Sequence, residues 1–153
     1  EPAKKFNIIY AHEAINKIVE ITKGYPFFIQ QLCKIVYDKT NKDVIELSDV
    51  ENCIDEFLSS LDERFFKSRY ERCAESDKKF IFAMVECGEL PCTISNVAHN
   101  LNKTVGSIST TRAQLISKGI IYPVRYKELD FTVPEFSGYI QRLEEYKQWC
   151  ISK

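Results

Sequence analysis

Residues 107–140 read SISTTRAQLISKGIIYPVRYKELDFTVPEFSGYI, and this stretch decides the fold of the second half of the chain. Its first part carries apolar residues at helical spacing, and Gly119 ends the helix. Two strands follow, over 120–125 and 129–133, and the second alternates apolar and polar residues as a half-buried strand does. A helix followed by a β-hairpin is therefore predicted. The residues expected to be buried in that helix are Val105, Ile108, Leu115 and Ile116.

Two further helices are predicted upstream of this stretch. One carries Phe80, Ile81 and Met84 on one face and closes near Gly88, and Thr93 caps the next. Three helices followed by a hairpin is the order of a winged helix-turn-helix. A last helix after Pro134 is expected to turn Phe136, Tyr139, Ile140 and Leu143 inward.

The first half of the chain carries helix signals throughout. Apolar residues at helical spacing predict helices over 11–22 and 26–36, and Ser48 and Glu51 form a predicted capping box for a third helix. A polar stretch near residues 72–77 separates the two halves. The predicted fold is mainly α, with a helical domain over 1–74 and a winged-helix domain with a two-stranded wing and a C-terminal helix over 75–153.

Composition indicates a globular protein without a strong charge signature. Of the 153 residues, 44% are hydrophobic and 28% are charged, and the formal net charge is −1. No apolar run approaches the roughly 20 residues that span a bilayer, and no secretory signal is present. The six cysteines form no C-x-x-C pair, so a metal site is not expected. A cytoplasmic protein with free thiols and no membrane partner is predicted.

Residues 21–38, ITKGYPFFIQQLCKIVYD, resemble the lid of bacterial and archaeal AAA-type ATPases related to the archaeal replication initiators and to STAND signalling ATPases. Residues 107–140 look like the winged helix that follows that lid in the same proteins. The order of the two also matches, and the resemblance covers nearly the whole chain. It implies that the chain is the C-terminal part of a larger ATPase.

The resemblance assigns a nucleotide-facing role to the G-x-P corner of the lid, here Gly24, Tyr25 and Pro26. A helix N-terminus offers amide groups and a positive dipole end to phosphate. The alternative is that Gly24 and Pro26 only form a tight turn between two helices. The family's sensing arginine is missing near this helix start.

The chain has no G-x-x-x-x-G-K-[ST] loop and no acidic strand end for magnesium. ATP and magnesium are therefore expected on an N-terminal ATPase core outside this chain, and the chain itself is expected to be no enzyme and to hold no cofactor.

The third helix of the predicted winged helix and the wing are the candidate DNA-binding surface. Hydroxyl and amide side chains with flanking cations suit phosphate and base-edge contacts. The candidate residues are Lys103, Thr104, Ser107, Thr110, Gln114, Lys118, Arg125 and Lys127. Arg112 flanks the apolar face and is predicted to form a structural ion pair.

The small charge surplus of the predicted winged helix leaves a protein partner as an alternative to DNA. Residues 77–133 contain seven basic and five acidic side chains, so phosphate attraction is weak for an isolated domain. The alternative keeps the fold but gives the winged helix to contacts with a regulatory protein, or to autoinhibitory contacts with the ATPase core.

Overall fold

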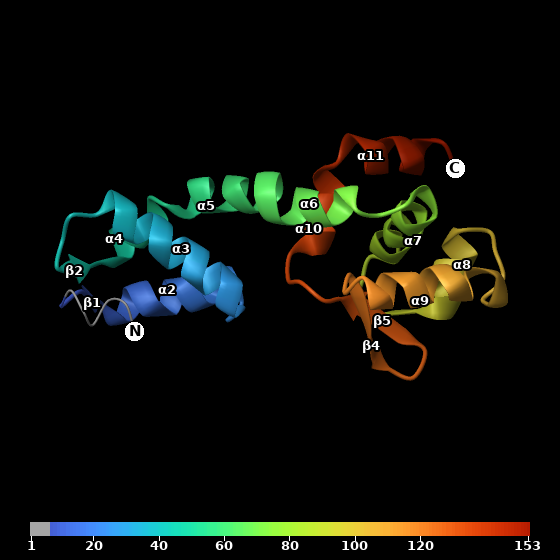
Figure 1. Cartoon of the computed structure of the whole chain (residues 1–153), viewed down its shortest axis with the longest axis horizontal. Coiled ribbons are helices and arrows are strands. Elements are labelled where there is room, and N and C mark those ends of the chain that lie inside the picture. The colour runs from blue at the N-terminus through green and yellow to red at the C-terminus, as the bar shows by residue number, and fades with distance from the viewer. Residues whose placement is uncertain (1–6) are drawn as a thin grey trace. The chain divides into compact units, whose positions relative to one another are not determined.

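The computed structural model describes residues 7–153, and these are mainly helical with two small sheets. The chain divides into two compact units, residues 1–63 and 64–153. Figure 1 shows the elements of both units.

The first unit is a small helical unit. Its elements are β1 (Ile9–Tyr10), α2 (His12–Thr22), α3 (Pro26–Lys39), β2 (Val44–Ile45), α4 (Leu47–Glu51) and α5 (Ile54–Ser60). The predicted helix over 11–22 is confirmed as α2, and it buries Ala14, Ile18 and Thr22. In α3 the buried side chains are Phe28, Leu32 and Val36, which follow the expected four-residue spacing.

Two details of the first unit differ from the prediction. Strands β1 and β2 form a parallel pair, with Ile9 opposite Val44, where only helices were expected. Two-residue strands are too short to show any alternation in sequence. The third helix begins after Glu46, whose backbone N–H donates to Asp49 Oδ2 at 2.9 Å, so the capping interaction lies two residues before the predicted one at Ser48.

The second unit contains helices packed beside a three-stranded sheet (Figure 1). A π-helical segment over Leu61–Phe66 precedes α6. The elements after it are α6 (Lys67–Glu71), α7 (Glu75–Glu86), β3 (Cys92–Thr93), α8 (Ile94–Asn100), a 3₁₀ turn (Gly106–Ile108), α9 (Ser109–Ser117), β4 (Ile121–Arg125), β5 (Glu128–Phe131), α10 (Phe136–Arg142) and α11 (Glu144–Ile151).

The sheet has strand order β3-β5-β4 and is antiparallel throughout. The predicted hairpin is confirmed as β4 and β5, and the alternation of β5 buries Leu129 and Phe131. Strand β3 was not predicted, because its two residues pair with β5 through contacts that lie far apart in sequence. Thr93 caps α8 as expected, since its Oγ1 accepts the Asn96 N–H at 3.2 Å.

Helix α7 is the centre of the second unit. Its side chains from Phe80 to Val85 are all buried, and α7 contacts both α8 and α9. At the other side of this core, Phe136 and Tyr139 of α10 pack near Phe66, whose ring stacks on Tyr139 at 5.4 Å. The core of the second unit therefore includes aromatic residues from the segment before α7.

Because these aromatic residues pack in the second unit, the boundary between the units lies earlier in the chain than the sequence suggested. The sequence suggested a boundary at 74/75, where the chain is polar, whereas the compact units part at 63/64. Phe66 and Tyr70 precede the polar stretch but belong to the second unit. The Tyr70 hydroxyl donates to Glu145 Oε2 of α11 at 2.6 Å. A mostly exposed polar stretch within one unit resembles a linker in sequence.

Candidate nucleic-acid interface

Helix α9 presents one face to solvent because the opposite face packs on α7. Ile108 and Leu115 are buried, as predicted, and they fix the orientation of the helix. Val105 was predicted to be buried but is 43% exposed, because the chain before α9 is a turn and does not continue its helical stripe. Besides Val105, the exposed side chains of the turn and helix are Lys103, Thr104, Ser107, Ser109, Thr110, Ala113, Gln114 and Ser117.

The hydroxyls before α9 take part in local hydrogen bonds. Thr104 Oγ1 accepts the Ser107 N–H at 3.2 Å, and Ser107 Oγ donates to the Thr104 carbonyl at 2.8 Å. Both predicted site residues therefore shape the turn that begins the helix. Thr110 and Gln114 lie farther along the helix with exposed side chains. Ala113 and Ser117 were not predicted, and their exposed small side chains keep the face open to close approach.

The tip of the β4–β5 hairpin carries Arg125, Tyr126 and Lys127, all exposed. Tyr126 is 87% exposed, and the Lys127 ammonium lies 5.2 Å from its ring centroid. The Lys127 carbonyl accepts the N–H of Ile94, the first residue of α8, at 2.9 Å. The tip is thus held beside the start of α8, and its two cations project from a fixed backbone.

Lys118 has a partner that the sequence did not reveal. Its ammonium lies 2.5 Å from Oδ2 of Asp77, whose side chain is fully buried. The same Oδ2 accepts the Ala74 N–H at 3.0 Å, so Asp77 caps the start of α7 and holds the end of α9. The nearby carboxylate also raises the pKa of Lys118. Lys118 was predicted to meet phosphate, and in the structure its ammonium is paired with Asp77.

For Arg112, an ion pair was predicted that the structure does not contain. It was expected to form a structural ion pair, yet within residues 7–153 its guanidinium makes no ion pair and no side-chain hydrogen bond. Its side chain is partly buried at the edge of α9. Of these two cations, Lys118 has an acidic partner and Arg112 has none among residues 7–153.

The segment that forms this surface is more basic than the charge balance over residues 77–133 indicates, because the acidic residues of that range lie outside residues 90–127. Residues 90–127 contain no aspartate or glutamate. They form β3, α8, α9 and β4. The basic residues of this segment are Lys103, Arg112, Lys118, Arg125 and Lys127. Only Lys118 pairs with an acid among residues 7–153, so four cations remain on the surface without an acidic partner.

The G-x-P corner forms a sharp turn between α2 and α3. Lys23 and Gly24 both have left-handed backbone conformations, with φ of 54° and 73°, and Pro26 occupies the first turn of α3. A Cβ added to Gly24 would meet no atom within 4 Å, so its backbone angle, and not crowding, favours glycine. Tyr25 packs edge-to-face on Phe28 at 4.8 Å, while Pro26 and Phe27 are exposed.

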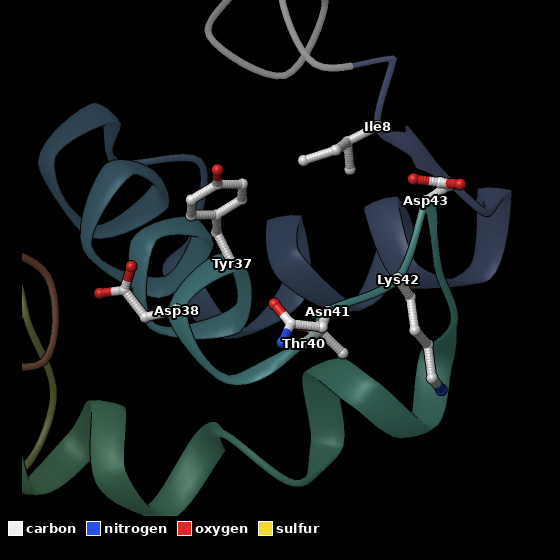
Figure 2. Close-up of a pocket in the computed structure, with 7 residues that line it drawn as sticks. All are labelled: Ile8, Tyr37, Asp38, Thr40, Asn41, Lys42 and Asp43. Atoms are coloured by element: carbon white, nitrogen blue, oxygen red, sulfur yellow. The ribbon is translucent and has the colours of Figure 1, made fainter.

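An open hollow lies at the other end of α3 (Figure 2). Its volume is ≈ 450 Å³, and it is lined by Ile8, Tyr37, Asp38, Thr40, Asn41, Lys42 and Asp43. The side chains of Asp38 and Lys42 point away from Ile8 in Figure 2. Lys42 forms an ion pair with Asp49 at 3.0 Å. Because α3 is about 20 Å long, this hollow is far from the corner at Gly24 and is not its nucleotide pocket.

Among residues 7–153, no three His, Cys, Asp or Glu side chains are grouped so that they could hold a metal ion. Within the same part of the chain, no helix has the length and apolar character needed to cross a membrane.

Comparison with known proteins gives a family but no activity. No curated protein matches the chain. A family model described as a domain of unknown function, DUF8462, matches residues 63–140. The match begins within one residue of the start of the second unit and includes α7, α8, α9 and the hairpin. The chain belongs to the DUF8462 family.

Proposed function

We propose that the second unit is a winged helix that binds double-stranded DNA through α9 and the tip of the β4–β5 hairpin. The order α7, β3, α8, α9, β4, β5 fits this fold, with α9 as the helix that enters the major groove. The exposed residues Thr110 and Gln114 would face base edges, and the hairpin tip would meet the backbone.

The observation that carries this proposal is the acid-free segment 90–127 with its four cations that lack an acidic partner. Each phosphate contact contributes about 0.9 to the slope of log affinity against log salt. Four contacts predict a slope of about −3.6, and hence an affinity that falls about 150-fold between 50 mM and 200 mM salt. Four contacts also predict weak, mainly non-specific binding for this unit alone.

Fluorescence anisotropy with a mixed-sequence duplex at several salt concentrations tests the proposal. Lys103→Gln and Arg125→Gln should each reduce the slope by about 0.9 and weaken binding to all sequences alike. Gln114→Ala should instead change the preferred sequence, by about 1–3 kcal/mol at one base pair. No anisotropy change at 20 mM salt would refute DNA binding.

We further propose that the first unit is the lid of an ATPase, and that the chain is a non-catalytic C-terminal part of a larger cytoplasmic protein. ATP and magnesium would bind an N-terminal ATPase core, with Gly24, Tyr25 and Pro26 facing the nucleotide. The support is the resemblance of residues 21–38 to such lids and the exposed proline at the start of α3. Closure of the lid would change how the second unit is presented to DNA.

Calorimetric titration with ATP and magnesium tests this assignment. The isolated chain should show no binding in the micromolar range, because it has no phosphate loop. In the larger protein, Pro26→Ala should weaken nucleotide binding and leave the fold intact. Micromolar binding by the isolated chain, or unchanged affinity of the folded Pro26→Ala protein, would contradict it.

Contact with a regulatory protein, or with the ATPase core itself, is the second candidate function. Three apolar residues at the outer strand and tip of the hairpin favour it, because Tyr122, Val124 and Tyr126 are 43%, 37% and 87% exposed. Tyrosine is enriched in protein interfaces relative to the rest of the surface. If this candidate is right, DNA binding is absent at low salt and the ATPase core protects β4 from hydrogen exchange.

A further inference from the structure

Two cations on α9 differ in their electrostatic environment. Lys118, just after the helix, is neutralised by the buried carboxylate of Asp77 at 2.5 Å. Arg112 has no acidic partner within residues 7–153, and residues 90–127 around it contain no acid. The positive charge of Lys118 is therefore paired with a carboxylate of the same unit, whereas the positive charge of Arg112 is not paired within residues 7–153.

The position of Arg112 determines where its guanidinium can reach. It lies four residues after Ile108 and three before Leu115, both of which are buried, so its Cβ is at the edge of the packed face. The side chain is partly buried. The aliphatic stem can cover apolar surface while the guanidinium emerges at the flank of the helix. A flank position faces a groove wall, where phosphates run, while Thr110 and Gln114 are exposed to solvent.

We infer that Arg112 is a phosphate-contacting residue of the DNA interface and that Lys118 is a positioning residue that does not touch DNA. This inference rests on the proposed DNA binding. A guanidinium has five N–H donors and pairs well with carboxylates and phosphates. No carboxylate of residues 7–153 forms an ion pair with Arg112. Lys118 instead fixes the end of α9 to the start of α7 through Asp77.

The experiment compares Arg112→Gln with Lys118→Met by fluorescence anisotropy on one mixed-sequence duplex between 50 mM and 200 mM salt. With Arg112→Gln, the slope should fall from about −3.6 to about −2.7, so that the affinity ratio across this range drops from about 150-fold to about 40-fold. With Lys118→Met, the slope should stay at the wild-type value, while the thermal midpoint falls because Asp77 remains buried without its cation. Arg112→Lys keeps the charge and should keep the slope.

The outcomes separate the two proposals. Absence of binding by the wild-type chain refutes the proposed function and this inference with it. Wild-type binding with an unchanged slope for Arg112→Gln refutes the inference alone, as does an equal loss of slope for Lys118→Met. Circular dichroism checks that each variant is folded. If Arg112→Gln is not folded, Arg112→Met, which keeps the aliphatic stem, replaces it with the same expected slope.

Discussion

Replacing Phe66 with alanine should destabilise the second unit strongly, although Phe66 precedes the polar stretch that resembles a linker. Phe66 is 1% exposed and contacts the rings of Phe136 at 5.9 Å and Tyr139 at 5.4 Å. Loss of a buried phenylalanine side chain costs about 3–5 kcal/mol, against a total of roughly 5–13 kcal/mol for a unit of this length. At a urea slope of about 2 kcal/mol/M, the midpoint should fall by about 2 M.

Trp149 provides an assay that reports the second unit. It is the only tryptophan of the chain, and its ring centroid lies 5.7 Å from that of Phe82 in α7. Urea unfolding followed by tryptophan fluorescence therefore measures loss of this core. Phe57→Ala is the matched control, because Phe57 is equally buried but packs on Phe28 in the first unit. Its effect on the Trp149 transition should be small.

An equal shift for both variants, or no shift for Phe66→Ala, would contradict the division of the chain at 63/64. If Phe66→Ala shows no folded baseline, Phe66→Leu should give a smaller loss in the same transition, because leucine leaves a smaller cavity than alanine.

Three further predictions follow from individual contacts. The Glu46 backbone N–H and Lys42 hold the pKa of the Asp49 carboxyl below its usual range. Asp49 therefore stabilises the fold above its unfolded pKa, and this stabilisation is lost as the pH falls through the lower folded value. In thermal melts, Asp49→Asn should destabilise the chain at pH 7 and much less at pH 3. Burial raises the pKa of Cys92 to about 12, so a thiol reagent at pH 8 should modify exposed Cys150 at once and Cys92 only on unfolding, as mass spectrometry would show. Thr93→Ala should lower the free energy of unfolding by about 1 kcal/mol, because it removes the cap of α8, and Thr93→Ser should restore it.

Local patterns were enough to predict most of the helices and the hairpin. Burial follows from residue spacing along one helix or strand, and so Ile18, Leu32 and Leu115 occupy the faces that the sequence indicated. The corner at Gly24 was also predictable, because a left-handed residue followed by a first-turn proline is a local signal. The same local logic placed Thr93 at the start of a helix.

The tertiary structure decided which charges are available on the candidate interface. Asp77 and Lys118 lie 41 residues apart in sequence, and only the packing of α7 against α9 brings them together. Nothing in the sequence near either residue indicates that pairing. The sequence therefore suggested that Lys118 has no acidic partner and that Arg112 has one. Most of the helices, the hairpin and the acid-free segment could be predicted, because each is a property of consecutive residues. The pairing of charges, the β3 strand and the boundary at 63/64 depend on contacts between distant segments, which only the folded chain specifies.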